Sequence, residues 1–245
     1  MGKIEDVLKS HHDIVRDKGY DPVFTVLVGS QNYGLATEHS DYDTFTFVLP
    51  SLDDISAIKQ PVSKTLEDEN GHIDIKDIRL GLNLLKKTTP NSIECFASKY
   101  KYIEEECYKF LATLPYYVFR CNTVNMMNSI GGMAHQLAHR NISAGKRLAH
   151  IIRMNCLLTN YFDVNSDILS MDDGSRELAL MAKCDPQNIK WAELCISLDE
   201  QIQHRIKSVD MNYFTDDSVL GVSVINDMQK FFALKGVMKG CESNV

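Results

Sequence analysis

The chain has 245 residues, of which 44% are hydrophobic and 24% are charged, a composition that excludes a disordered chain or a fibre. The N-terminal segment has no apolar signal core, and no apolar run approaches the roughly 18 residues of a membrane span. The seven cysteines form no CxxC pair. We therefore expect a cytoplasmic protein with reduced thiols and no membrane contact.

The charge is distributed unevenly along the chain. A net charge of −7 argues against nonspecific coating of nucleic acid. Residues 107–162, however, contain six Lys and Arg residues and no acid, whereas the remainder holds 20 basic residues against 33 acidic ones. This segregation predicts a basic surface for an anionic partner. The alternative is a helical core in which the basic residues only solvate one face.

The first predicted element is an amphipathic helix over residues 2–18, since apolar residues recur near the helical period. His11 and His12 lie on this helix, and we expect them to be solvated. Gly19 and the pair Asp21-Pro22 end the helix before a strand at 23–28.

Residues 24–49 predict a strand, a glycine turn, a short helix and a second strand. Asp41 and Asp43 stand two residues apart at the start of the second strand, so their side chains project from one face. Two carboxylates held this close are best explained by a divalent cation between them. The turn at Gly29 and Ser30 leads into a helix N-terminus, which favours phosphate binding.

A third carboxylate is expected from the next strand, at residues 72–75, after an acidic turn at 67–71. The candidates are Asp74, in the strand, and Asp77, at the N-cap position of a helix that follows. We favour Asp74, because a strand residue can face Asp41 and Asp43 whereas a cap side chain is bonded to its own helix.

Another helix is expected after Pro90, capped by Asn91 or Ser92. Its Glu94 is interpreted first as a capping residue and second as a support for the site. Beyond it the pattern is helical, and we predict a domain at 1–105 followed by a helical domain at 106–245.

One helix of the second domain contains Lys146, His150 and Arg153 at spacings of four and three residues. The three side chains therefore share one stripe. They face either a bound anion or solvent. The later helices, expected near 175–183, 187–207 and 217–236, look like packing elements.

The order of Gly29-Ser30, Asp41-x-Asp43 and a lone Asp74 in a later strand resembles the DNA-polymerase-β-like nucleotidyltransferase superfamily. Over residues 24–183 the chain further resembles a bacterial and bacteriophage branch of predicted nucleotidyltransferases. The resemblance implies an α+β fold, with a small mixed β-sheet flanked by helices and then an all-helical domain that closes a cleft.

The resemblance also implies two-metal transfer of a nucleoside monophosphate from a nucleoside triphosphate such as ATP, with release of pyrophosphate. The residues that it assigns to two magnesium ions, or to manganese instead, are Asp41, Asp43 and Asp74. Those that it assigns to the nucleotide are Gly29, Ser30, Lys146, His150 and Arg153. In that branch an Arg–Lys pair is common at the D-x-R start of the helix that follows the third carboxylate's strand. Here Arg79 is followed by Leu80, which implies a larger role for Lys146.

The acceptor stays open among a tRNA or other RNA, a small molecule and a protein hydroxyl. One alternative function is a catalytically idle fold that binds RNA or a protein through residues 107–162. Another is a metal-dependent phosphohydrolase that uses the same carboxylates.

Overall fold

The computed structural model describes residues 2–38, 40–57 and 59–242. Within these residues there is one mixed sheet with the strand order β3-β4-β2-β1-β5. Its strands are β1 (Pro22–Leu27), β2 (Thr44–Val48), β3 (Ser63–Asp68), β4 (Gly71–Asp77) and β5 (Lys101–Ile103). β2 and β4 run parallel, and the other neighbours are antiparallel. The predicted α+β class is confirmed.

The predicted strands at β1, β2 and β4 are confirmed, but β3 and β5 were not expected. β3 has the sequence SKTLED and is largely exposed, because it is the edge strand that pairs only with β4. A polar edge strand carries no apolar alternation, so its pairing is visible only in the sheet. β5 has only three residues.

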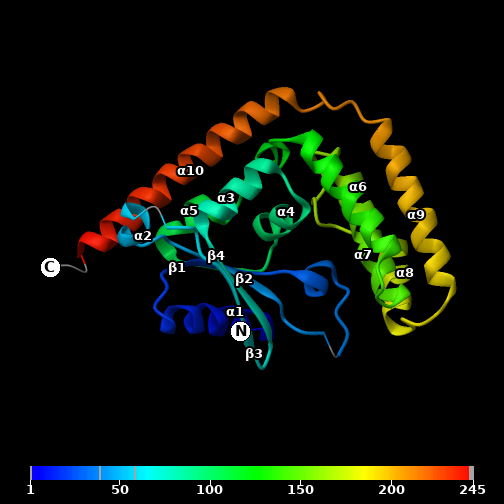
Figure 1. The fold of residues 1–245 in the computed structure, drawn as a ribbon, viewed down its shortest axis with the longest axis horizontal. Coiled ribbons are helices and arrows are strands. Elements are labelled where there is room, and N and C mark those ends of the chain that lie inside the picture. The colour runs from blue at the N-terminus through cyan, green and yellow to red at the C-terminus, as the bar shows by residue number, and fades with distance from the viewer. Residues whose placement is uncertain (1, 39, 58, 243–245) are drawn as a thin grey trace.

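Helix α1 (Lys3–Asp17) covers one face of the sheet (Figure 1). His11 and His12 are fully buried there, so the expectation that they are solvated was wrong. His11 Nδ1 lies 2.9 Å from Thr44 Oγ1, and His12 Nδ1 lies 3.0 Å from Thr25 Oγ1. The threonine hydroxyls of this face provide the hydrogen-bond partners that allow the imidazoles to be buried.

The opposite face carries aromatic side chains and is covered by α3 (Ile78–Lys87) and α4 (Pro90–Ala97). Phe24 and Phe47 stack with ring centroids 4.7 Å apart, and Phe96 of α4 packs against both. Because side chains alternate along a strand, Phe45 lies on this same face, and Asp43 lies two residues earlier, just before β2 begins. Asp43 therefore lies on the side of the sheet that α4 covers, and not on the side that α1 covers.

The N-cap predicted for α3 is confirmed, whereas the one predicted for α4 is not. Asp77 accepts a hydrogen bond from the Arg79 backbone N–H, which confirms it as the N-cap of α3. The N-cap of α4 is Thr89, so the expected Asn91 or Ser92 was wrong. The helix begins earlier because Pro90 suits the first helical position, where no N–H is needed.

The remaining regular elements of the described residues are helices. The shorter elements are η1 (Gly29–Tyr33), α2 (Leu52–Ser56), η2 (Glu105–Cys107), α5 (Tyr108–Leu111) and η3 (Tyr116–Arg120). The longer helices are α6 (Thr123–His139), α7 (Ala144–Tyr161), α8 (Asp173–Cys184), α9 (Lys190–Lys207) and α10 (Thr215–Glu242). No helix in the described ranges is both long enough and apolar enough to cross a bilayer.

Helices α6 to α9 lie together beside the sheet, and α10 returns across α3 toward α2 (Figure 1). Two side-chain hydrogen bonds join α10 to α3, from Lys86 to Asn226 and from Gln229 to Asn83. One buried hydrophobic cluster contains Phe24 of the sheet as well as Phe232 of α10. Helix α10 therefore packs the helical part of the chain against the face of the sheet that α3 and α4 cover.

Candidate functional site

The Gly29 turn connects β1 to η1 and lies beside Asp43. Gly29 has a φ of 76°, a left-handed conformation that favours glycine. A Cβ at Gly29 would lie 3.5 Å from Asp43 Oδ2. The Gly29 N–H, which the sequence places against a phosphate, donates instead to Glu94 Oε1 at 2.7 Å. This hydrogen bond from Gly29 to Glu94 therefore anchors the turn to α4.

Glu94 is a site-supporting residue, and its interpretation as a cap was wrong, since Thr89 and Ser92 form the capping pair. Both Glu94 carboxylate oxygens accept from Arg153 Nη2, at 2.9 and 3.0 Å, and the pair is buried. The Arg153 guanidinium also lies 4.1 Å from the centre of the Tyr33 ring. Burial, together with the Glu94 charge, raises the pKa of Tyr33 well above its ordinary value. The sequence missed this link because Glu94 and Arg153 are 59 residues apart.

Asp41 and Asp43 line a cavity of about 510 Å³ together with Gly29 and Ser30. Asp41 is exposed and Asp43 is half-buried. His72 Nδ1 lies 3.2 Å from Asp43 Oδ1, a neighbour that the sequence analysis did not anticipate. The available signal was its position two residues before Asp74 on one strand face.

Asp74 stands on β4 directly opposite Phe45 of β2, so it is one diagonal step along the same face from Asp43. Its Oδ1 accepts a 2.5 Å hydrogen bond from Thr65 Oγ1, and it is not among the residues that line the cavity with Asp41 and Asp43. In the part of the chain that the structure describes, the three carboxylates do not form a group whose ligand oxygens all lie within 4.8 Å of one another.

Asp77 is excluded as a free third carboxylate by its own contacts. Only 2% of the residue is exposed. Its two oxygens accept from the Arg79 guanidinium, with a shortest distance of 2.6 Å, as well as from the helix backbone. Asp41, Asp43 and Asp74 remain as a set of hard oxygen donors on one side of the sheet, and this donor chemistry fits a magnesium-type cation.

A basic wall stands across the cavity from the carboxylates. Lys146, His150 and Arg153 of α7 all line the cavity, and Lys183 of α8 lies beside them. Lys183 also donates to the Leu35 carbonyl at 2.5 Å. The sequence analysis missed Lys183 because its helix shows only a packing pattern. Acidic side chains from the sheet side and basic side chains from α7 and α8 thus line the same cavity.

The three predicted basic residues of α7 are not equivalent. His150 is exposed, yet desolvation by the atoms packed around its ring, followed by the charges of Arg153 and Lys183, lowers its pKa to about 4. Such a pKa favours the neutral imidazole at pH 7. Because Arg153 is paired with Glu94, Lys146 and Lys183 are the lining cations best placed to meet an anion.

Two further cavities adjoin the first. One of about 450 Å³ shares Gly29, His150 and Arg153 with it and also contains Phe45 and Asn91. The next, of about 490 Å³, shares Phe45 and Asn91 and extends over the aromatic face of the sheet toward α6. The result is a run of hollows from the carboxylates across the sheet, roomy enough for more than a phosphate group.

The predicted basic surface of residues 107–162 is smaller than expected. Arg120 is buried, where it donates to the Tyr161 and Tyr116 carbonyls and lies within 5.5 Å of three aromatic ring centres. Arg153 is buried against Glu94. Arg147 donates to the Ala138 carbonyl. The absence of acids in this segment therefore reflects structural arginines as well as surface charge.

Comparison with known protein families matches residues 4–157 to RlaP, the RNA repair pathway DNA polymerase beta family. No curated protein matches the chain. The family match spans more than half of the 245 residues and contains the Gly29 turn, the three carboxylates and the α7 wall. Membership indicates nucleotidyltransferase-type activity, in agreement with the resemblance seen in the sequence. On these grounds the chain belongs to the RlaP family, within the DNA-polymerase-β-like nucleotidyltransferases.

Proposed function

We propose that this protein is a metal-dependent nucleotidyltransferase that moves a nucleoside monophosphate from a nucleoside triphosphate to an acceptor hydroxyl and releases pyrophosphate. The observation that carries the proposal is the shared cavity, in which Asp41 and Asp43 face Lys146 and Lys183 beside Ser30. Carboxylates on one wall and ammonium groups on the other suit a substrate whose negative charge is bound partly by cations and partly by protein.

Asp41 and Asp43, with Asp74 beside them on the sheet, are the residues that would hold Mg²⁺ or Mn²⁺. The bound cation would lower the pKa of the acceptor hydroxyl and neutralise charge on the oxygens of the reacting phosphate. His72, at 3.2 Å from Asp43, orients that carboxylate along the strand face. The Asp74 carboxylate is similarly oriented by Thr65.

The triphosphate is bound in this proposal by the Ser30 hydroxyl and by the ammonium groups of Lys146 and Lys183. Arg153 acts through Glu94, because the buried pair fixes the Gly29 turn against α7. The neutral His150 side chain can donate a hydrogen bond to a phosphate without adding charge. The adjoining cavities over Phe45 and Asn91 provide room for the base and for the acceptor.

We further propose that the acceptor is an RNA hydroxyl. Its support is the description of the family as one of an RNA repair pathway. Exposed Arg140 lies in the cavity next to the carboxylates and would meet a phosphate of the RNA backbone. A long acceptor is limited to this side of the molecule, because the chain as a whole is acidic.

The test is to incubate the protein with Mg²⁺, each α-labelled nucleoside triphosphate and RNAs with free hydroxyl ends, and to measure pyrophosphate and label transfer. Asp43→Asn should lower the rate more than about 100-fold, since even partners behind a metal ligand are worth up to that factor. Asp173→Asn, which changes an exposed acid of α8, should keep the wild-type rate.

Two outcomes would contradict the proposal. Wild-type protein that releases no pyrophosphate, yet binds RNA with a steep salt dependence, would establish the idle binding fold instead. Label transfer to a small molecule or a protein, and not to RNA, would retain the transferase and overturn the RNA acceptor.

A further inference from the structure

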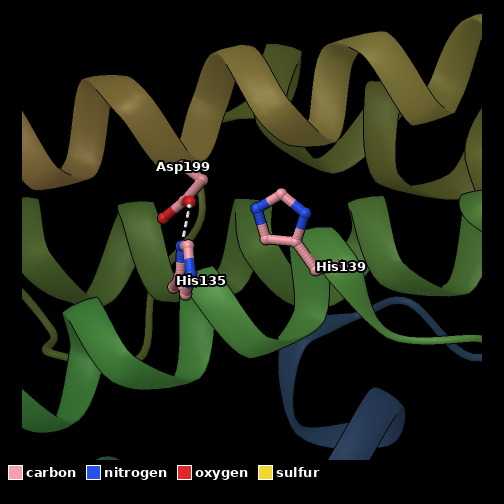
Figure 2. A group of neighbouring side chains, drawn as sticks. All are labelled: His135, His139 and Asp199. Atoms are coloured by element: carbon pink, nitrogen blue, oxygen red, sulfur yellow. Dashed lines mark hydrogen bonds and ion pairs between the residues drawn. The ribbon is translucent and has the colours of Figure 1, made fainter.

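A second cluster of ionisable side chains lies between α6 and α9, on residues outside those that line the nucleotide cavity. His135 and His139 are one turn apart on α6, so both imidazoles rise from the same face of that helix. Asp199 of α9 reaches toward them, as Figure 2 shows. The ligand atoms of the three side chains all lie within 4.8 Å of one another.

The Asp199 carboxylate is buried and oriented by its neighbours. One oxygen, Oδ1, accepts from Gln203 Nε2 at 2.9 Å, and the same amide nitrogen donates to the Gly131 carbonyl of α6. The other oxygen, Oδ2, lies 3.0 Å from His135 Nδ1. The hydrogen bond from Gln203 fixes the Asp199 carboxylate from behind, as the outer hydrogen bonds of ligating carboxylates do in metal sites.

The distances suit a small tetrahedral ion. Zinc bonds of about 2.0–2.2 Å to nitrogen and oxygen place neighbouring ligand atoms about 3.3 Å apart. The 3.0 Å separation between His135 and Asp199 is already close to that value. His139 has to turn its ring inward, and it is exposed, with its ring centroid 4.7 Å from that of His135. Rotation of an exposed side chain between staggered rotamers is fast and cheap.

We propose that His135, His139 and Asp199 form a binding site for a divalent transition metal of the zinc class, which joins α6 to α9. Imidazole with carboxylate selects such ions, whereas magnesium prefers oxygen donors alone. The site is therefore chemically distinct from the carboxylates Asp41 and Asp43. Three protein ligands leave a fourth position for water.

The bound ion would stabilise one wall of the nucleotide cavity. α6 and its C-cap contribute Gln136 and Arg140 to the cavity that adjoins the carboxylates, while α9 lies beyond the family match at residues 4–157. An ion bound by side chains of both α6 and α9 would fix the position of α6 relative to α9, on the side of α6 that faces away from the sheet. This inference does not depend on the proposed nucleotidyl transfer, because it concerns ion binding and stability.

The experiment uses full-length, tag-free protein treated with a chelator and then titrated with Zn²⁺ in excess Mg²⁺. Calorimetry should give one Zn²⁺ per chain, and the unfolding temperature should rise on Zn²⁺ addition. Co²⁺ should give the visible absorption of a tetrahedral site. His135→Gln and His139→Gln should each weaken Zn²⁺ binding at least tenfold and abolish the thermal shift. Both residues are exposed, so these variants should keep the fold.

Two variants serve as controls. His204→Gln, an exposed histidine on α9, and Asp43→Asn at the carboxylate site should both bind Zn²⁺ as the wild type does. Wild-type binding that neither the His135 nor the His139 substitution weakens would overturn the site. A wild-type protein that shows no Zn²⁺ binding and no thermal shift would do the same.

Discussion

The buried side chain of Glu94 contacts two of the residues that line the cavity, Gly29 and Arg153. It accepts from the Gly29 N–H at 2.7 Å and pairs with Arg153 at 2.9 Å, so it joins the turn after β1 to α7. A buried charge without its partner is costly, whereas removal of both charges is often tolerated. The position of the turn therefore depends on a charge pair and not on the turn sequence alone.

We expect Glu94→Gln to lower the free energy of unfolding by about 3 kcal/mol, because Arg153 would remain buried without a counter-charge. Urea unfolding measures this change. The double variant Glu94→Gln with Arg153→Met should be more stable than the single variant, since no unpaired charge remains. A Glu94→Gln protein as stable as the wild type would show that the pair does not hold the turn.

Asp74 and Asp77 lie three residues apart and should respond differently to substitution. Asp77→Ala should cost at least about 1 kcal/mol of stability, the usual value of an N-cap, and leave the activity of the folded protein intact. Asp74→Asn should change stability by no more than about 0.5 kcal/mol, as a partly exposed position does, and abolish pyrophosphate release. Urea unfolding and a pyrophosphate assay on each variant give the two measurements. The reverse pattern would make Asp77 the third carboxylate.

At the scale of elements, α1 carries two buried histidines against the sheet. Burial lowers the pKa of His11 and of His12, and the charges of Asp68 and Glu104 oppose that effect only in part. The unfolded chain takes up these protons near pH 6.5, whereas the folded protein resists protonation until a lower pH. The stability that α1 provides is therefore complete above about pH 6.5 and is lost as the pH falls toward the folded pKa values.

We expect the urea concentration at the unfolding midpoint to decrease as the pH is lowered from 7.5 to 5.5. A double substitution, His11→Gln with His12→Gln, should reduce that slope, although it lowers stability at every pH because it disturbs packing on the threonine face. His204→Gln, at an exposed position of α9, should keep the wild-type slope. An unchanged slope in the double variant would show that other groups cause the acid sensitivity.

At the scale of the whole molecule, α10 links the two ends of the fold. It starts beside the helical part and packs back over α3, and its Phe232 is fully buried in the cluster that also contains Phe24 of the sheet. A core shared in this way should unfold in one step. The division at residue 105 that the sequence predicts would then describe the chain order of strands and helices, not two separate folding units.

Phe232→Ala should lower the free energy of unfolding by about 3–5 kcal/mol, the usual cost of emptying a buried aromatic site. Leu234→Ala, on the same helix but 65% exposed, should change it by no more than about 0.5 kcal/mol. Trp191 fluorescence reports on α9 and circular dichroism on the whole chain, so the two urea transitions should coincide in the wild type. Transitions at different urea concentrations would instead establish independent domains.

Local patterns were sufficient to predict much of this protein. The strand, turn and strand around Gly29 and the Asp77 cap of α3 were predicted from residues a few positions apart. The stripe of Lys146, His150 and Arg153 on α7 followed from helical spacing. Backbone conformation and side-chain direction depend mainly on near neighbours, which is why these predictions held.

Tertiary structure decided what surrounds those residues. His72 beside Asp43, Lys183 in the basic wall and Glu94 beneath Gly29 each come from an element distant in the chain. Desolvation lowers the pKa of His150, and burial ties Arg153 to the Glu94 counter-charge, so the three side chains of the stripe are not equivalent. Charge, hydration and hydrogen-bond partners depend on which surfaces meet in the folded chain, and no local spacing contains that information.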